Sequence, residues 1–349
     1  MQIAAFDRIP YTLPLTAPTV WAGEPHRQRH GVLARLVDAE GRVGWGDAAP
    51  LPGFSPESLA ETRDALGLVG PALVGRAFDP VTLVTDGPVH RALDAAGLPS
   101  AARFGLDLAL ADLAAQALGR TLPQALHPDP PVVLSLTGLI TDGDAPAQAR
   151  ALAEAGYGAV KLKVGRGTVA EDLAAVRAVR QALPASVALR LDANRAWTWD
   201  QAVAFAGGVA GLALDYVEEP LADPSRLPEL WHDTGLPVAV DESVQEGAEI
   251  RGWATAAVLK PTLVGGLMAT LRQAAAARAV GVRPVLSAAY ESGVGLRGLA
   301  ALAAATGGAA AGLDTYRRLA ADVLAPLPFD RPQVDLPSLF ARPPSVRVP

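Results

Sequence analysis

The stretch AVKLKVGRGTVAEDLAAVRAVRQALPASVALRLDA, residues 159–193, decides the fold class of this chain. It opens with the short apolar run AVKLKVG, continues with apolar residues at helical spacing, and ends with a second short run, VALRLDA. A strand, a helix and a second strand in this order favour two parallel strands joined by a crossover helix. The first strand carries Lys161 and Lys163, although its apolar neighbours predict burial. The stretch therefore predicts a βαβ unit with charged side chains on a buried strand.

Short apolar runs and alanine-rich helical segments alternate about seven times between residues 132 and 308. Near-continuous apolar strands are typical of parallel sheets whose two faces are both covered. The repeat predicts an α/β fold with a (β/α)7β barrel, a modified TIM barrel, and a doubly wound sheet is the competing architecture.

The first 50 residues have a different pattern, in which the turn residues DAEG join two segments of alternating polarity. Such a pattern predicts an antiparallel hairpin, and helical spacing predicts helices over 55–68 and 100–118. We therefore expect an α+β N-terminal domain, a barrel domain, and a proline-rich C-terminal segment that returns to the first domain, at residues 1–105, 106–310 and 311–349 respectively.

The composition is that of a soluble globular protein: 349 residues, 50% of them hydrophobic, with a formal net charge of −6. This balance gives no basic surface for nucleic acid or for a membrane, and we expect neither partner. The absence of cysteine excludes disulfides and thiolate ligands, so any metal site should be rich in oxygen. The N-terminus lacks the pattern of a signal peptide, and we expect a cytoplasmic location.

Polar side chains recur at the carboxyl ends of the predicted barrel strands. Because these ends meet at one mouth of a parallel barrel, where the active sites of this fold lie, we expect the side chains to converge. Side-chain alternation places Arg190 and Asp192 on one face of their strand, as it does Lys161 and Lys163. The residues at strand ends are Lys161, Lys163, Asp192, Glu218, Asp241, Lys260 and Ser287.

Only three lysines stand against 27 arginines in this chain, and all three lysines belong to this set. Two lysines on one strand face make each other easier to deprotonate, and a nearby metal cation adds to the effect. An arginine guanidinium does not lose its proton in proteins, which explains why lysine is retained there. Three carboxylates without His or Cys beside them favour a hard divalent cation, Mg²⁺, with Mn²⁺ as a substitute. Together these groups predict metal-assisted proton abstraction beside the carboxylate of a small molecule.

Each motif also has a plain structural interpretation. DANRAW fits a turn before a helix, VDES fits a helix N-cap, and VEEP fits a solvated strand end. These separate interpretations do not explain why carboxylates and lysines recur at one end of successive strands. GVGLRG, residues 293–298, matches the GxGxxG pattern of dinucleotide sites, but it lies outside a first βαβ unit. Alternatively, GVGLRG starts a helix whose backbone N–H groups bind a substrate carboxylate.

The motifs and their order resemble those of the enolase superfamily and, within its muconate-lactonizing-enzyme-like subgroup, of the o-succinylbenzoate synthases of menaquinone biosynthesis. VKLKVG resembles the strand of that family with two lysines. LRLDANRAWT, VEEP and DES resemble its three metal-ligand strands, and LKPTLVGG resembles the strand with the opposite lysine. GWGDAAPLPGFSPES resembles the capping-domain loop of the synthases, and LSAAYESGVGL with GLDT resembles their late barrel segments. The resemblance covers most of the chain and implies an enolase-like barrel with a capping domain.

The resemblance implies a reaction and a role for the matching residues. Asp192, Glu218 and Asp241 would bind Mg²⁺. Lys163 would remove the proton α to the carboxylate of 2-succinyl-6-hydroxy-2,4-cyclohexadiene-1-carboxylate, giving an enediolate. The same lysine, now protonated, would assist loss of the hydroxyl group in a syn dehydration to 2-succinylbenzoate. The implied enzyme is a hydro-lyase.

The remaining matches imply supporting roles. Lys260 would stabilise the enediolate as a cation, and Lys161 would adjust Lys163 and contact the carboxylate. The loops VWAGEPHRQRHG and APLPGFS would close over the site and hold the succinyl tail. Substrate contacts or support of the metal ligands would come from Arg190, Asn194, Glu242 and Ser287.

Two departures from the family pattern bear on substrate contacts. Asp47 stands where the family has Glu in GWGE, and SAAYES replaces a more serine-rich stretch. The alternative functions are an N-succinylamino acid racemase, a dipeptide epimerase or a muconate-type cycloisomerase of the same superfamily, and a barrel that binds without catalysis. An epimerase is expected to carry an Asp-x-Asp pair at the last strand, which GLDTYRR lacks.

Overall fold

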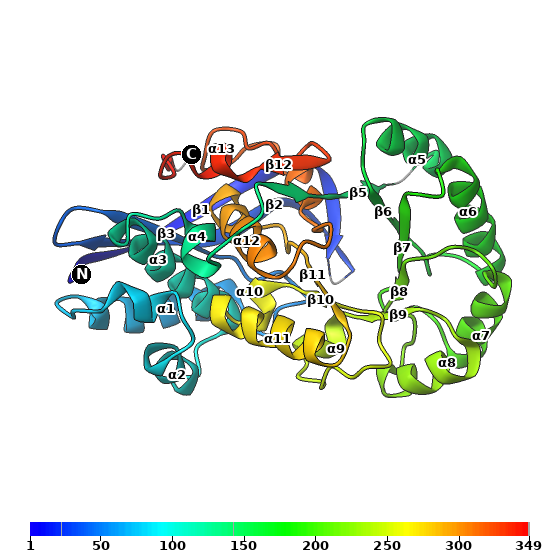
Figure 1. Ribbon diagram of the computed structural model, residues 1–349, viewed down its shortest axis with the longest axis horizontal. Helices are drawn as coiled ribbons and strands as arrows, with labels where there is room; N and C mark the ends of the chain where they lie inside the picture. Colours follow the sequence, from blue (N-terminus) through cyan, green and yellow to red (C-terminus); the bar gives the residue numbers. More distant parts are fainter. Residues whose placement is uncertain (22, 142, 348–349) are drawn as a thin grey trace.

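The computed structural model of the protein describes residues 1–21, 23–141 and 143–347. Its N-terminal part is an antiparallel sheet in which a long hairpin is followed by a third strand (Figure 1). The third strand pairs with the second across the turn at DAEG, which confirms the predicted hairpin. The strands are β1 (Ile3–Trp21), β2 (Glu24–Asp38) and β3 (Val43–Ala48).

The segment VWAGEPHRQRHG, expected to be a loop, is mostly strand, so this prediction is wrong. Trp21 ends β1, and Glu24 begins β2, while Ala22 lies outside the described residues. Pairing of Thr19 with His26 and of Trp21 with Glu24 extends the ladder to the end of the hairpin. The paired backbone groups make residues 19–21 and 24–31 the outer end of the β1–β2 hairpin and not an open loop. We call these residues the hairpin arm.

Helix α3 (Ser100–Ala117) lies between this sheet and the barrel, packed on β3 on one side and on barrel helices on the other. It is therefore buried on nearly all sides, and its sequence is mostly apolar, with the buried Arg103 and Asp107 as an ion pair. A Cβ on Gly46 would lie 1.7 Å from the carbonyl oxygen of Gly105, so these glycines permit the close contact of strand and helix. The neighbouring helices are α1 (Leu59–Leu73), η1 (Pro80–Leu83), α2 (Pro88–Ala95) and α4 (Leu122–Leu126).

Helix α1 begins later than expected from helical spacing. Ser58 is its N-cap and forms a capping box with Glu61, while residues 49–57 form the loop of the APLPGFS motif. The capping box satisfies backbone N–H groups at the helix start, which fixes the boundary there.

Seven parallel strands form the barrel sheet, and their spatial order follows their chain order from β5 to β11. Parallel bridges from Leu136 to Ala311 and from Ser287 to Gly312 add a short eighth strand that closes the sheet between β5 and β11. An unbroken strand order confirms the barrel over the doubly wound sheet, in which the order reverses. The strands are β5 (Thr137–Ile140), β6 (Ala159–Lys163), β7 (Ala188–Asp192), β8 (Tyr216–Glu218), β9 (Val238–Val240), β10 (Ala256–Leu259) and β11 (Arg283–Leu286).

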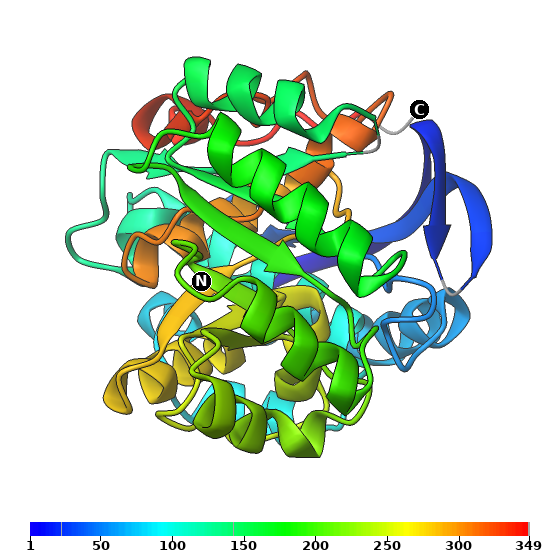
Figure 2. The same cartoon turned by 90° about the vertical axis from the view of Figure 1, so that its right-hand side faces the viewer.

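Helices cover the outside of the barrel, and Figure 1 shows α5 to α8 as an arc around β5 to β9. In Figure 2 the same green helices face the viewer. Among the described residues, no helix is long and apolar enough to cross a membrane. The helices are α5 (Ala145–Glu154), α6 (Val169–Ala182), α7 (Trp199–Gly208), η2 (Pro224–Arg226), α8 (Leu227–Thr234), α9 (Glu242–Gln245), α10 (Pro261–Val264), α11 (Leu267–Ala279), α12 (Gly293–Ala305) and η3 (Asp314–Arg318).

The C-terminal segment runs back along the barrel and the antiparallel sheet. Its strand β12 (Gln333–Asp335) pairs with β4 (Val133–Ser135), and α13 (Leu336–Phe340) follows. Leu319 forms a bridge with Leu15 of β1. The predicted division at residue 105 falls inside α3, and residues 311–312 belong to the barrel sheet. The division into capping domain, barrel and returning segment stays a prediction.

Candidate active site

The register of the barrel strands places the predicted residues at one mouth. Lys163 pairs with Asp192, and Asp192 pairs with Glu218, at the carboxyl ends of β6, β7 and β8. Asp241 directly follows β9, and Lys260 directly follows β10. Because parallel strands share their direction, these five side chains gather at the same end of the barrel.

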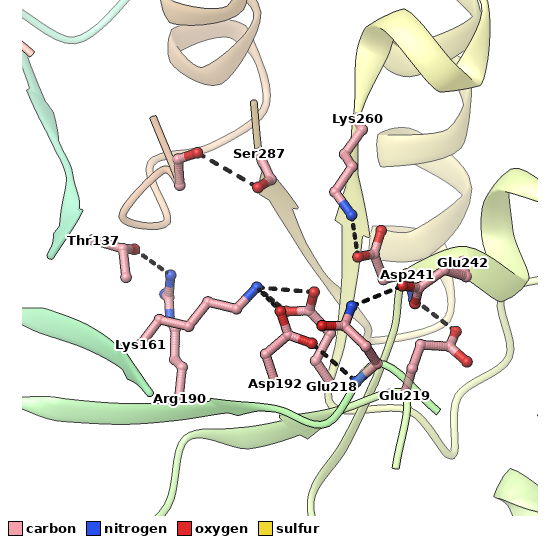
Figure 3. A network of polar contacts seen from close by, with 12 residues as sticks. Thr137, Lys161, Arg190, Asp192, Glu218, Glu219, Asp241, Glu242, Lys260 and Ser287 are labelled. Carbon is pink, nitrogen blue, oxygen red and sulfur yellow. Dashed lines mark hydrogen bonds and ion pairs between the residues drawn. The ribbon is translucent and has the colours of Figure 1, made fainter. Parts of the chain in front are cut away.

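Lys161 joins two carboxylates from neighbouring strands (Figure 3). Its Nζ lies 3.0 Å from Asp192 Oδ2, and it donates a hydrogen bond of 2.9 Å to Glu218 Oε1. Burial disfavours the charged amine, but Asp192 and Glu218 outweigh burial and raise the pKa of Lys161 well above its usual range. Lys161 is therefore a cation at neutral pH.

Lys260 is the second fixed cation and lies on the other side of the carboxylates. Its Nζ donates to Asp241 Oδ2 (Figure 3). Burial is the largest single influence and acts to lower the pKa of Lys260, but the Asp241, Glu218 and Glu242 carboxylates together outweigh it and the net pKa is raised. The ammonium form is thus stabilised at the place where negative charge already collects.

Lys163 differs from both of these lysines. Its side chain is exposed at the mouth, yet its amine is partly desolvated, and this desolvation lowers its pKa. Asp192 opposes the shift, whereas the positive charges of Arg166 and Lys161 add to it. Of the three lysines, Lys163 is the one whose pKa is lowered, so it loses its proton most easily and suits the role of a base.

The carboxylates themselves repel one another. Glu218 is 1% exposed and Asp241 is fully buried. Burial and the nearby charge of Asp192 raise the pKa of Glu218, because no neighbour fully offsets the assembled negative charge. Glu242 stands beside them, and burial followed by the charge of Asp241 raises the pKa of Glu242 to about 7.

These groups fit a hard divalent cation. Glu242 Oε2 and Asn194 Oδ1 are buried oxygens without a hydrogen bond among the described residues, and oxygen donors are what Mg²⁺ prefers. Glu218 Oε2 is also buried and lies 2.8 Å from Lys161 Nζ. Within the same residues, no three His, Cys, Asp or Glu side chains are arranged so that they could hold a metal ion. The lysine ammonium groups contact the carboxylates instead and supply the compensating charge.

Asn194 and Glu242, predicted to support the ligands, lie side by side at this mouth. Asn194 Nδ2 donates to Glu242 Oε1 at 2.9 Å, and its backbone N–H donates to Asp192 Oδ1 at 3.2 Å. Asn194 takes a φ of 43°, in the left-handed region, which asparagine tolerates better than most residues. The turn after β7 thereby aims one residue at two carboxylates.

Glu219 is a supporting residue that the sequence reasoning missed. It is fully buried, and its Oε1 accepts hydrogen bonds of 2.9 Å from the backbone N–H groups of Asp241 and Ser243. Its Oε2 accepts from the Arg195 guanidinium and the Ser243 hydroxyl. Glu219 therefore fixes the backbone that carries Asp241. The doubled glutamate of VEEP was the available signal, but it does not say that the second carboxylate turns back to the next loop.

We expect Glu219→Gln to lower the free energy of unfolding by about 1.5–3 kcal/mol, the usual value of hydrogen bonds to a charged group. The glutamine side chain would lose the ion pair with Arg195, and its NH₂ group would face N–H or O–H donors that now bind the carboxylate. Urea unfolding measures the change. Glu246→Gln is the matched control, because Glu246 binds the same Arg195 but its side chain is 60% exposed. Equal losses in both variants would contradict a special role for Glu219.

Arg190 and Ser287 contact the barrel wall. The Arg190 guanidinium donates to the Thr137 hydroxyl at 2.7 Å (Figure 3). It also donates to Asp215 and to the Ala310 carbonyl. These contacts join β7 to the neighbourhoods of β5, β8 and the eighth strand. Ser287 Oγ lies 3.4 Å from the Gly312 carbonyl oxygen. A direct role of either residue at the site stays a prediction.

The loop and the hairpin arm that were predicted to close over the site border one cavity. This cavity has a volume of about 440 Å³, and its lining includes Trp21, Gln28, Pro50 and Ser55. The ring of Tyr290, which follows the end of β11, meets Trp21 edge to face with centroids 5.0 Å apart. The arm and the loop thus reach the barrel mouth, and their contact with a succinyl tail stays a prediction.

Two family models match this chain. The one described as enolase C-terminal domain-like matches residues 144–339, and the MenC N-terminal domain matches residues 6–113. The o-succinylbenzoate synthase of Enterobacter sp. is 35% identical over 91% of this chain and 94% of its own length. The o-succinylbenzoate synthase of Edwardsiella ictaluri is 34% identical over 91% of this chain and 92% of its own length. The solved structure of the N-succinyl Arg/Lys racemase of Bacillus cereus has a TM-score of 0.84 and covers 96% of this chain and 93% of its own. At 22% sequence identity this similarity is one of fold.

The closed barrel, with carboxylates and lysines gathered at its mouth, and the matching C-terminal family model define an enzyme of the enolase superfamily. Within this superfamily, the match to the MenC N-terminal domain and the similarity to curated o-succinylbenzoate synthases identify the family. The chain belongs to the o-succinylbenzoate synthase family, as the resemblance of its motifs predicted.

Proposed function

We propose that the protein dehydrates 2-succinyl-6-hydroxy-2,4-cyclohexadiene-1-carboxylate to 2-succinylbenzoate, the o-succinylbenzoate synthase reaction of menaquinone biosynthesis. The observation that carries the assignment is the asymmetry of the lysines. Lys163 has a lowered pKa, whereas Lys161 and Lys260 are held as cations against the carboxylates. A base and fixed positive charge at one mouth suit removal of a proton beside a carboxylate.

Lys163 acts twice in the proposed reaction. As the neutral amine it takes the proton from C1, and the electron pair of the C–H bond moves into the carboxylate to give an enediolate. The same nitrogen, now an ammonium group, then gives its proton to the hydroxyl on C6. The C6–O bond breaks, water leaves on the face from which the proton was taken, and the ring becomes aromatic. The substrate thus loses one water molecule to give 2-succinylbenzoate, and Lys163 returns to its neutral form.

Lys260 and Lys161 stabilise the charge that forms. Both are ammonium groups before the reaction begins, so they need no reorganisation when the enediolate appears. Lys161 also repels a proton on Lys163, because the two amines lie on the same face of β6. The residue with the raised pKa therefore assists the one with the lowered pKa.

Asp192, Glu218 and Asp241 would hold Mg²⁺, or Mn²⁺ in its place, through carboxylate oxygens. The ion would supply Lewis-acid polarisation of the substrate carboxylate. Asn194 and Glu242 would keep the ligands oriented through the hydrogen bonds described above. We further propose that the protein is cytoplasmic and that its partner is a small-molecule carboxylate, the substrate.

The direct test supplies the cyclohexadiene substrate with Mg²⁺ and follows the aromatic product by absorbance and mass. We expect turnover that stops on chelation and returns with added Mg²⁺. Absence of turnover, together with racemisation of N-succinylamino acids, would replace the proposal by the racemase alternative. That alternative uses the same proton abstraction, and the likeness in fold to a solved racemase is the observation in its favour.

The dependence of kcat/KM on pH should respond to Arg166. Lys163 must be neutral to act as the base, so kcat/KM rises as the pH rises through the pKa of Lys163. The charge of Arg166 lowers this pKa, and Arg166→Gln should therefore move the rise to higher pH. Arg177→Gln, on the neighbouring helix α6, is the control and should leave the profile in place. A shift to lower pH, or equal shifts in both variants, would contradict the assignment of the base.

A further inference from the structure

Arg29 is a buried guanidinium on β2 that joins three separate segments. It is 1% exposed. Its Nε donates to the Tyr290 carbonyl at 3.0 Å, and its Nη1 donates to the Pro50 carbonyl at 2.7 Å. One side chain therefore connects the hairpin arm, the loop after β3 and the loop after β11. The full set of acceptors is the carbonyl groups of His30, Ala49, Pro50, Ala289 and Tyr290.

The loops that Arg29 connects form an apolar cover at the barrel mouth. The guanidinium carbon of Arg29 lies 5.9 Å from the centroid of the Trp21 ring, which in turn contacts Tyr290. Both loops contribute side chains to one cluster, so a shift of either loop would change the surface that faces a ligand. The cluster includes Trp21, Leu51 and Ala289, with Phe54 and Tyr290 packed against it.

The loop after β11 needs such a support. Tyr290 has a φ of 62°, a left-handed conformation that is unfavourable for a residue with a side chain. Arg29 binds the carbonyl groups on both sides of this bend. The next residue, Glu291, accepts hydrogen bonds of 2.6 Å from the Thr262 hydroxyl and from the backbone N–H of Ala289. Since Thr262 is two positions after Lys260, the same network reaches the strand end that carries this lysine.

Only arginine fits this position. The planar guanidinium presents five N–H groups in fixed directions, whereas a lysine ammonium presents three donors from one point. The charge is also compensated, because the buried carboxyl groups of Asp47 and Glu291 lie nearby. Asp47 accepts from the Tyr11 hydroxyl and from Ser292, so it belongs to the same junction and not to the substrate contacts.

We infer that Arg29 is a positioning residue for substrate binding, which holds the hairpin arm and both loops as one cover over the barrel mouth. The inference rests on the proposed function, because it assigns this cover to the substrate of that site. A displaced cover would weaken binding of the substrate and of the transition state alike. KM should then rise while kcat changes little.

The test compares Arg29→Lys with Arg180→Lys. Arg180 also donates to backbone carbonyls, including that of Val187 at 2.8 Å, but at the opposite end of the barrel. We expect Arg29→Lys to raise KM by about tenfold or more with kcat within about threefold of wild type, as for a displaced binding group. Arg180→Lys should leave both constants unchanged. If the two variants lose similar thermal stability and both keep the wild-type KM, Arg29 is merely structural and the inference fails.

Hydrogen exchange separates this inference from the proposed function. We expect the backbone amides of 51–55 and 289–292 to exchange faster in Arg29→Lys than in wild type, and to be unaffected in Arg180→Lys. Inactivity of the wild-type protein toward the cyclohexadiene substrate would remove the proposed function, yet the exchange comparison could still be made. Unchanged exchange in both segments would overturn the positioning role whatever the activity. Arg29→Met repeats the comparison if Arg29→Lys does not fold.

Discussion

Lys163→Arg is expected to lower kcat by about 10³- to 10⁴-fold, because general acid–base catalysis contributes up to this amount and one group here serves both steps. The variant has a side chain of similar length, but arginine remains protonated and cannot accept the proton from C1. Steady-state rates of product formation under saturating substrate measure the effect. KM should change much less, since the fixed cations Lys161 and Lys260 are unchanged.

Two comparisons make the Lys163 result specific. Lys163→Ala should regain part of its activity with added methylamine, because the exposed position admits a small free amine. Arg180→Lys, at the far end of the barrel, should keep wild-type kcat. A Lys163→Arg enzyme that retains more than about a tenth of wild-type kcat would show that another group removes the proton.

Glu218→Gln is expected to abolish the response to Mg²⁺ without weakening the metal-free protein. Loss of this carboxylate should reduce metal affinity by more than about 100-fold, the upper range for supporting residues alone. The pKa of Glu218 is raised in the folded protein by burial and by Asp192, so its charge opposes folding as the pH rises above the ordinary pKa of glutamate. A neutral amide removes this opposition. At neutral pH in chelator, the Tm of the variant should equal or exceed that of wild type.

Thermal unfolding with and without Mg²⁺ measures both parts of the Glu218 prediction. Wild type should gain Tm with the ion, as expected when a ligand binds only the folded state, and Glu218→Gln should not. Glu229→Gln is the control, because Glu229 lies on α8 in a surface pair with Arg226. A variant that keeps the full Mg²⁺-dependent gain would exclude Glu218 as a ligand.

The candidate site could be located from the sequence because its residues fall at regular places. Lys163, Asp192 and Glu218 each end a short strand, and a parallel register brings such ends together. The hairpin arm could not be recognised in the same way. Its polar residues look like a loop in the sequence, but the partner strand pairs with them up to Trp21.

Residues that depend on distant partners were not predictable. Asp47 accepts its hydrogen bonds from Ser292, which lies 245 positions away in the chain, and the sequence alone suggested a substrate contact instead. Glu219 was hidden in the same motif as Glu218, because only the turn after β8 directs it to the backbone of Asp241. Such contacts depend on loop conformations that no local pattern specifies.

The sequence by itself determined the barrel, its mouth and the identity of the carboxylates and lysines there, because strand period and βα repeat are local properties of the chain. Only the tertiary structure decided how the lysines differ. Lys161 and Lys260 are held as cations by carboxylates from neighbouring strands, while partial desolvation and nearby positive charge lower the pKa of Lys163. The physical reason is that a pKa depends on burial and on charges brought together from separate segments, and these exist only once the chain has folded.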